Sequence, residues 1–201
     1  GLGDVYKRQA KGNLTCAFAF EDGPRHNPIV SEVTAEKKGD KFLINGKKCF
    51  VVDGGFADLI IIAAKSPKGT SLFITNKNSK GMEIKEAKMV DSRNSANIIF
   101  TDLEVNSENV LGEIDNAQDT IEEVLDIARA AISAEMLGGA LEAFEITINY
   151  LKEREQFGVK IGSFQALQHR AANMFTELEL CKSCVLESLS CFEEKSNDVP
   201  R

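Results

Sequence analysis

The stretch YLKEREQFGVKIGSFQALQHR, residues 150–170, joins two long helical patterns through a short connector. Before it, apolar residues from Ile121 to Leu151 recur every three or four positions, which is the period of an α-helix. No proline interrupts this run, so we predict a helix of about 35 residues, roughly 50 Å long. Glu155–Gly162 forms the connector, and Ser163 is the predicted N-cap of a second long helix.

Each predicted helix carries one apolar stripe. The first stripe comprises Ile121, Leu125, Ala128, Ile132, Met136, Ala140, Phe144, Ile148 and Leu151. The second comprises Phe164, Leu167, Ala171, Met174, Leu178, Cys181, Val185, Leu189 and Phe192. Gly138-Gly139 in the first helix predicts either a kink or a close helix crossing. Because two antiparallel helices cover only part of both stripes, we expect further helices and a long-helix bundle.

The first half of the chain shows short β-type runs instead. The runs are Leu14–Phe20, Val30–Lys37, Lys41–Ile44, Lys47–Val52, Leu59–Ala64, Ser71–Thr75, Met82–Lys88 and Ala96–Val105. Turn signals separate them at Gly39-Asp40, Asn45-Gly46, Gly54-Gly55, Pro67-Lys68-Gly69 and Gly81. Runs at this spacing without intervening helices favour an antiparallel β-barrel or sandwich. The predicted fold class is therefore α+β, a β domain followed by a truncated long-helix bundle.

Composition narrows the class of protein. Hydrophobic residues make up 43% of the 201 residues and charged residues 27%, which is typical of a globular protein with a real core. No apolar run approaches the roughly 18 residues that a membrane span needs. The net charge of -7 argues against nucleic-acid binding, which needs a basic face. It does not exclude a phosphate-bearing cofactor, because one or two arginines suffice to bind a diphosphate.

Motifs of common catalytic sites are absent from the sequence. We find no Ser/His/Asp order, no GxGxxG loop and, with only two histidines, no metal site. The five cysteines are irregularly spaced, which suits a reducing compartment. Cys181 and Cys184 lie within helical periodicity, so we interpret them as small residues on a packed helix. Periodicity and spacing alone do not yield a function.

The ends suggest a fragment with a foreign leader. Residues 1–10, which begin GLGDVYKRQ, have neither clear periodicity nor the apolar core of a signal peptide, and we expect them to be non-native. Residues 11–113 are the predicted β domain. Residues 114–201 are the predicted helical domain, with its first two long helices only.

Three segments resemble the acyl-CoA dehydrogenase family. The most specific contains Tyr150, Arg154, Phe157, Gly158, Phe164, Gln165 and Gln168, which match the family's Tyr, Arg-x-x-Phe-Gly and Phe-Gln-x-x-Gln positions. Residues 44–55 resemble its strand-turn-strand beside the flavin, and Asp126 to Arg129 its Asp-x-x-Arg. The resemblance covers about residues 11–195 and is closest in pattern to the small subunit of pimeloyl-CoA dehydrogenase.

The resemblance implies an activity and its partners. Family members bind FAD and desaturate an acyl-CoA thioester between the α and β carbons. A glutamate removes the α-proton, and the β-hydrogen leaves as hydride to the flavin. Hydrogen bonds to the thioester carbonyl stabilise the developing enolate. Implied partners are the acyl-CoA, an electron-transfer flavoprotein and further dehydrogenase subunits in a homo- or hetero-oligomer, in the bacterial cytoplasm or the mitochondrial matrix.

Residues of the helical half match positions with known roles in the family. Arg154 matches the arginine that contacts the FAD diphosphate from the neighbouring subunit, and the alternative is a solvated charge at a helix end. Phe157, Phe164 and Gln165 match positions that contact the adenosine end of FAD, although both rings could be core. Asp126 and Arg129 match residues near the acyl-CoA, and the alternative is a salt bridge within the helix.

The β half departs from the family pattern. Phe20-Glu21-Asp22-Gly23-Pro24-Arg25-His26-Asn27 stands where the family has Thr-Glu-Pro-Gly-x-Gly-Ser-Asp beside the flavin. Phe20 and His26 are candidate FAD contacts there, and an imidazole can replace a serine hydroxyl as hydrogen-bond donor. Phe50 replaces a tryptophan that lies against the isoalloxazine ring, and Val52 replaces a threonine that would hydrogen-bond the flavin.

The catalytic glutamate has no counterpart among the 201 residues. In most of the family it lies beyond residue 201, and the alternative position, one residue before Arg129, is Ala128. We expect Glu135 and Glu142 to be surface charges. A non-catalytic FAD-binding or structural partner subunit therefore remains an alternative to a dehydrogenase subunit. An acyl-CoA oxidase and a plain interaction module are further alternatives that no residue favours.

Overall fold

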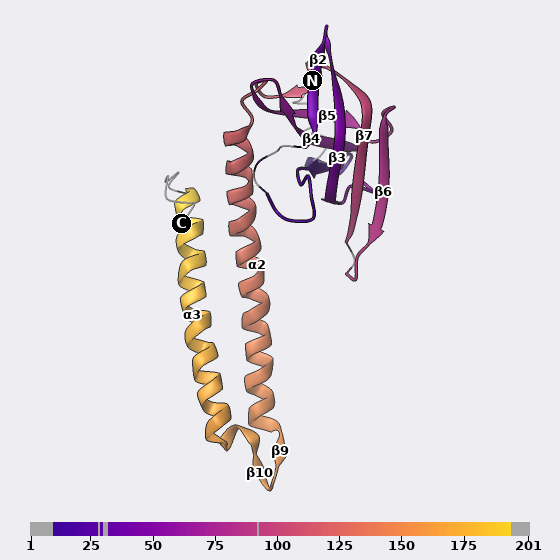
Figure 1. The fold of residues 1–201 in the computed structure, drawn as a ribbon. Helices are drawn as coiled ribbons and strands as arrows, with labels where there is room; N and C mark the ends of the chain where they lie inside the picture. Colours follow the sequence, from indigo (N-terminus) through magenta and orange to yellow (C-terminus); the bar gives the residue numbers. More distant parts are fainter. Residues whose placement is uncertain (1–9, 28, 30–31, 92, 194–201) are drawn as a thin grey trace. The chain divides into compact units, whose positions relative to one another are not determined.

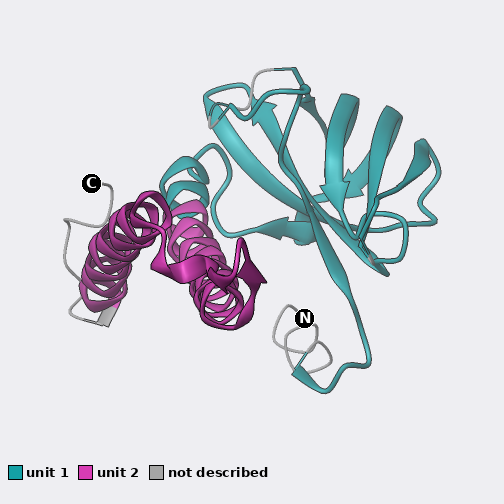
Figure 2. Cartoon of the chain, turned by 90° about the horizontal axis from the view of Figure 1, so that it is seen from below, with its two compact units in different colours: residues 1–122 teal, residues 123–201 magenta. Residues whose placement is uncertain are grey.

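The computed structural model describes residues 10–27, 29, 32–91 and 93–193. The chain divides into two compact units, Gly1–Glu122 and Glu123–Arg201 (Figure 2). Of the leader predicted for residues 1–10, only Ala10 belongs to the described residues. No helix among the described residues is long and apolar enough to cross a membrane.

The first unit is built on one eight-stranded sheet. Its strands are β1 (Cys16–Ala19), β2 (Thr34–Lys38), β3 (Lys41–Val52), β4 (Leu59–Ser66), β5 (Gly69–Asn76), β6 (Met82–Lys88), β7 (Asn94–Asn106) and β8 (Val110–Leu111), with a short 3-10 turn at Ser107–Asn109. The order across the sheet is β6-β7-β3-β2-β4-β5-β8, and β1 pairs with β4 (Figure 1). The predicted β domain is thus confirmed.

The sheet is mixed and open, which corrects the expected antiparallel barrel. β1 pairs with β4 in parallel over four residues, and β2 pairs with β4 in parallel at one position. Within the described residues, the sheet's path ends at β6 and β8 without closing. The sheet instead folds over its own core, because the rings of Phe42 on β3 and Phe73 on β5 lie 5.0 Å apart although two strands separate them in the sheet. This arrangement is closer to a sandwich.

β3 is a single strand of 12 residues, whereas the sequence predicted two strands and a turn at Asn45-Gly46. The register with β7 shifts between Ile44 and Gly46, so the turn signal marks a β-bulge. Gly46 has a φ of +131°, and a Cβ there would lie 2.9 Å from the Cα of Val33. Glycine is required for the close approach of the two backbones, and that requirement is what mimicked a turn signal.

The second unit contains most of the two predicted helices, which are confirmed. α2 (Gln118–Glu153) begins in the first unit and runs for 36 residues, and α3 (Gln165–Glu193) runs for 29. The connector folds as a hairpin of β9 (Glu155–Gln156) and β10 (Val159–Lys160), followed by the 3-10 turn η2 (Ile161–Ser163). The two helices lie side by side with this hairpin at one end of the pair (Figure 1).

The apolar stripe of α2 is rotated from its predicted position in the middle of the helix. Four predicted members, Ala128, Ile132, Met136 and Ala140, are exposed in the described chain. The less exposed residues are Ala130, Ala134, Leu137 and Leu141. A step of four residues advances about 40° around a helix at each repeat, so a stripe drawn with fours alone drifts off the contact face. Alternating steps of three and four stay on it.

Two further local predictions need revision. Ser163 is the last residue of η2, where its hydroxyl donates to the carbonyl of Lys160 at 2.7 Å, so it does not cap α3. The carbonyl of Phe164 accepts the first bonds of α3, from the main-chain N–H groups of Leu167 and Gln168. A Cβ at Gly138 or Gly139 would meet no atom within 4 Å, so among the described residues no close helix crossing occurs there.

Candidate functional site

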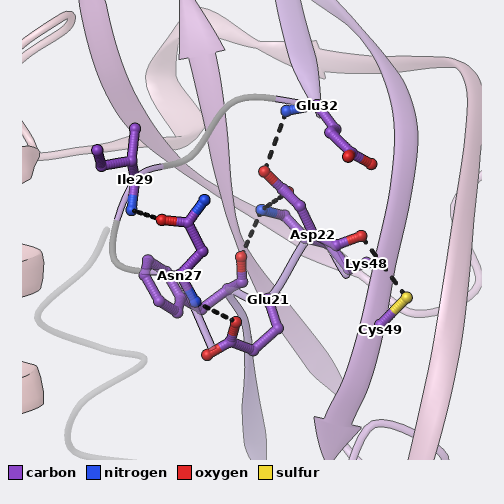
Figure 3. Close-up of polar contacts among 8 residues, drawn as sticks. Glu21, Asp22, Asn27, Ile29, Glu32, Lys48 and Cys49 are labelled. Carbon is purple, nitrogen blue, oxygen red and sulfur yellow. Dashed lines mark hydrogen bonds and ion pairs between the residues drawn. The ribbon is translucent and has the colours of Figure 1, made fainter. Parts of the chain in front are cut away.

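The β1–β2 loop, defined here as residues 20–27, carries a linked pair of polar side chains. Nδ1 of His26 lies 2.5 Å from Oε1 of Glu21. The main-chain N–H of Asn27 donates to Oε2 of Glu21 at 3.2 Å, as Figure 3 shows. The His26 side chain is half-exposed. Because the carboxylate of Glu21 accepts from both residues, it fixes the bend of the loop and orients the imidazole. His26, a predicted flavin contact, is thus placed by its own loop.

The ring of Phe50 stands out from β3 on an unusual backbone. Phe50 has a φ of +50°, a conformation rare for aromatic residues, and the register with β7 shifts between Lys48 and Val51. The main-chain N–H of Phe50 donates to Oδ1 of Asn97 on β7 at 3.2 Å. This second bulge leaves Phe50 55% exposed where a regular strand would bury one face. Strained residues of this kind gather at binding sites.

Val52 follows Phe50 by two residues and is 45% exposed. Phe20, by contrast, is packed inside the unit, with only 5% of its surface exposed and its ring 5.5 Å from that of Phe18. The ring of Phe20 therefore supports the β1–β2 loop from beneath. Phe50 and Val52 offer an apolar surface to a ligand.

Arg154 lies between the end of α2 and β9. Its main-chain N–H donates to the carbonyl of Tyr150, and its own carbonyl accepts from Ile161, both at 2.9 Å. The backbone is therefore held on both sides, while the side chain is exposed. Among the described residues, the guanidinium has no hydrogen bond or ion pair. An exposed, unpaired guanidinium on a fixed backbone suits a phosphate-bearing ligand.

Phe157 occupies the tip of the β9–β10 hairpin. Phe157 and Gly158 have φ values of +55° and +76°, which define a tight hairpin turn of the type I′ class. Phe157 is 92% exposed, and its ring lies 6.2 Å from that of Phe164 in an edge-on arrangement. Gln165 follows Phe164 as the first residue of α3. The structure thus gathers Arg154, Phe157, Phe164 and Gln165 at one end of the helical pair.

Asp126 and Arg129 form an ion pair one turn apart on α2, with Nη1 and Oδ1 at 2.5 Å. Their distance from the hairpin is large, because about 25 helical residues separate Arg129 from Arg154, or roughly 40 Å. Glu135 and Glu142 are exposed, as predicted. Within the second unit, the predicted substrate contacts Asp126 and Arg129 and the predicted nucleotide contacts of the hairpin are therefore at separate places.

The sequence analysis missed three residues that hold the backbone at these candidate sites. Asn97 holds the Phe50 bulge, and Lys48 is wholly buried beneath the β1–β2 loop. Gly162 lets η2 pack on α2, since a Cβ there would lie 2.7 Å from the carbonyl oxygen of Leu151. Only Lys48 had a detectable signal, because steps of two residues from the inward-facing Phe42 and Ile44 reach it.

Comparison with known proteins places these features in a family. The model of the acyl-CoA dehydrogenase middle domain matches residues 21–103, and that of the acyl-CoA dehydrogenase C-terminal domain matches residues 119–200. Cyclohex-1-ene-1-carbonyl-CoA dehydrogenase of Syntrophus aciditrophicus is 32% identical over 200 residues, which cover 94% of this chain and 48% of that protein. Caffeyl-CoA reductase-Etf complex subunit CarC of Acetobacterium woodii is 33% identical over 195 residues, covering 92% and 52%.

A solved structure agrees with the fold. The acyl-CoA dehydrogenase of Geobacillus kaustophilus superimposes with a TM-score of 0.88 at 27% identity, covering 96% of this chain and 54% of that one. The chain thus spans about half the length of these relatives. Because two domains of one family match in order along most of its length, the chain belongs to the acyl-CoA dehydrogenase family.

Proposed function

We propose that the complete protein is an FAD-dependent dehydrogenase that forms an α,β double bond in an acyl-CoA thioester. The observation that carries this proposal is that Arg154, with an exposed side chain, and the edge-on rings of Phe157 and Phe164 belong to the same β9–β10 end of the helical pair. A cation and exposed aromatic rings at one end of a helical pair suit the diphosphate and adenine of a dinucleotide. Family membership supplies the identity of that dinucleotide.

The described residues fit FAD at both of its ends. At the flavin end, the half-exposed ring of Phe50 offers an aromatic face, and the Glu21–His26 pair offers a polar group. At the nucleotide end, Arg154 would bind the diphosphate, and Phe157 and Gln165 would contact adenosine. Val52 lacks the hydroxyl of the family's threonine, so the flavin's hydrogen bond at this point would come from the main chain or from water.

One binding site would draw on two copies of the helical unit. Asp126 and Arg129, proposed for the acyl-CoA, lie roughly 40 Å along α2 from Arg154, which exceeds the extended length of FAD. A substrate bound near Arg129 of one protomer therefore needs the hairpin of another protomer to complete its nucleotide site. This geometry supports an oligomer in which Arg154 and Phe157 act across a subunit boundary.

The chemistry proposed for this site is proton and hydride removal from adjacent carbons. Bound FAD would accept the hydride, and a carboxylate would take the proton. That carboxylate is expected beyond residue 201, and the Asp126–Arg129 ion pair would help to position the acyl-CoA. We further propose an electron-transfer flavoprotein as redox partner, since one relative is named as a subunit of an Etf complex.

A non-catalytic partner subunit is the second candidate, because Ala128 and Val52 depart from the family's functional residues. The two candidates differ at one position of the complete reading frame. A glutamate at the family's catalytic position supports the dehydrogenase, and its absence supports the partner subunit.

Replacing Arg154 by alanine tests the proposed cofactor site. In the protein from the complete reading frame, Arg154→Ala should weaken FAD binding by about a hundredfold, since charge-assisted bonds to phosphate contribute about 1.5–3 kcal/mol each. Flavin absorbance after gel filtration measures retention. Arg170→Ala, which removes an exposed arginine of α3, is the matched control and should stay yellow. Full flavin content in Arg154→Ala would overturn the assignment.

A further inference from the structure

Lys48 is enclosed in the first unit, on the inward face of β3. Its side chain has no exposed surface, and Nζ donates to the carbonyl of Phe20 and to Oδ1 of Asp22, each at 2.6 Å. Burial lowers the pKa of Lys48 because the ammonium loses its hydration, while the Asp22 carboxylate acts in the opposite direction. A buried cation is costly unless its donors are satisfied, so this lysine depends on the two acceptors that the β1–β2 loop supplies.

The carboxylate of Asp22 links three segments of chain. Oδ1 accepts from Lys48 on β3, and Oδ2 accepts from the main-chain N–H of Glu32 at 3.0 Å, shortly before β2 (Figure 3). Asp22 itself belongs to the loop. Both oxygens are thus used by donors on different segments, and one side chain ties the loop to the strand beneath it and to the approach to β2.

Cys49, the next residue of β3, also binds the main chain of the β1–β2 loop. Its N–H donates to the carbonyl of Glu21 at 2.7 Å, and its Sγ lies 3.6 Å from the carbonyl of Asp22 (Figure 3). Beyond the buried ring of Phe20 at its start, the loop has little apolar anchorage, because residues 24–27 are all exposed. Polar contacts to β3, more than burial, therefore set where Glu21 and His26 lie.

We propose that Lys48 and Asp22 are positioning residues that fasten the β1–β2 loop so that Glu21 and His26 meet the flavin nucleotide. The link to the nucleotide rests on the proposed function, whereas the fastening of the loop does not. Lys48, which holds the loop, lies two positions before Phe50, whose exposed ring is the proposed flavin contact. Both residues belong to β3, so this short stretch of strand fixes the position of the loop relative to the ring of Phe50.

Asp22→Asn tests the fastening with the least disturbance. Asparagine has one acceptor oxygen in place of two, so it can keep the bond to Lys48 or to Glu32 but not both. The loop provides its own probe, because trypsin can cleave after the exposed Arg25. In flavin-free protein from the complete reading frame, we expect cleavage after Arg25 to accelerate about tenfold, because losing a bond to a charged group favours local opening.

The same variant tests the link to the nucleotide. Titration of FAD fluorescence should show about tenfold weaker binding for Asp22→Asn, measured well below its thermal midpoint, which should fall because the buried Lys48 loses its charged partner. Lys48→Met should act in the same direction, and if it does not fold, Asp22→Asn carries the test. Lys47→Met, at the exposed neighbouring position, is the matched control and should change neither quantity. Cleavage after Arg93, on a different turn, monitors general loosening of the unit.

The outcomes separate the two parts of the proposal. Unchanged cleavage after Arg25 in Asp22→Asn would overturn the fastening. Faster cleavage with unaltered FAD affinity would overturn the positioning role, as would equal acceleration after Arg25 and Arg93. If the unsubstituted protein binds no FAD, the proposed function itself fails, and the cleavage rates still decide the fastening.

Discussion

At the scale of single residues, backbone strain marks the proposed flavin surface better than side-chain identity does. Phe50 keeps a left-handed conformation on a bulge, held by one bond from Asn97. Replacing a tryptophan by phenylalanine, as the family pattern suggests, keeps an aromatic face and reduces its area. The protein therefore maintains an energetically costly geometry for a side chain that contributes little to its own core.

Phe50→Ala should separate binding from stability. Because the ring is 55% exposed, its loss should change the free energy of unfolding by less than about 1 kcal/mol. Lost stacking should weaken FAD binding by about tenfold or more. Urea unfolding and FAD titration measure the two effects. Phe42→Ala, which empties a core position, should instead cost about 3–5 kcal/mol. A large stability loss in Phe50→Ala would show that the ring supports the fold.

The sequence indicated Arg154 and Phe157 as candidate FAD contacts, but not how exposed their side chains are. The spacing of residues 150–170 matches a family pattern that can be recognised without a structure. Exposure of Phe157 at a turn with two positive φ values became visible only in three dimensions. The buried pair of Lys48 and Asp22 joins residues 26 positions apart, and no local pattern predicts such a pairing.

At the scale of elements, the segment that leads into α2 is tied to the first residues of β5 within the first unit. The main-chain N–H of Ala117 donates to the carbonyl of Thr70 at 2.9 Å, and that of Asp115 donates to Oγ of Ser71 at 2.8 Å. Ile121, in the first turns of α2, is buried. The first turn of a helix predicted to belong to the second domain thus packs in the first unit. The predicted boundary at residues 113–114 stays a proposal.

Gly69→Ala should break this attachment. A Cβ at Gly69 would lie 2.2 Å from the carbonyl oxygen of Asp115, so the segment before α2 must move. We expect a loss of about 1–3 kcal/mol in the free energy of unfolding, as for other overpacked sites. Thermal or urea unfolding measures it. Gly23→Ala, where a Cβ meets nothing within 4 Å, is the control and should be near neutral. Equal stability of the two variants would contradict the attachment.

Helices and strands were predicted correctly where local periodicity determines the structure. The prediction failed where contacts with distant residues determine it. Both long helices and all eight predicted β-runs correspond to observed elements, the eight runs falling in seven strands, because 3.6-residue and two-residue periods are local signals. The two runs flanking Asn45-Gly46 merged into β3, since glycine is also needed at a bulge against Val33. The rotated stripe of α2 shows the same limit, because a helix with apolar residues on several faces does not specify its contact face.

At the scale of the whole molecule, much apolar surface on the helical unit is exposed in the described chain. Exposed large hydrophobic residues of α2 and α3 include Ile127, Ile132, Met136, Ile146, Tyr150, Phe175, Leu180 and Leu186. Surfaces of this kind mark interfaces. The sequence predicted exposed apolar surface on both helices, but of these residues only Ile132 and Met136 belong to the predicted stripes.

The isolated 201 residues should therefore associate and remain inactive. We expect concentration-dependent association in sedimentation experiments, because the apolar residues of α2 and α3 would find partners among copies. Dye reduction with acyl-CoA thioesters should not exceed background, because no proposed catalytic base lies in the chain. Turnover by the isolated chain would contradict the position assigned to the catalytic glutamate. A monomer at high concentration would contradict the interpretation of the helical surface.

The pairing of β3 with β7 determines when β3 can complete its hydrogen bonds during translation. Lys41 pairs with Asn106 and Val52 with Ser95, so β3 leaves the ribosome well before the strand that completes it. Contacts between such distant positions form slowly, because a long loop must close first. During this interval the inward residues Phe42, Ile44 and Val51 would be open to chaperones, and a pause in translation before residue 94 would prolong that exposure.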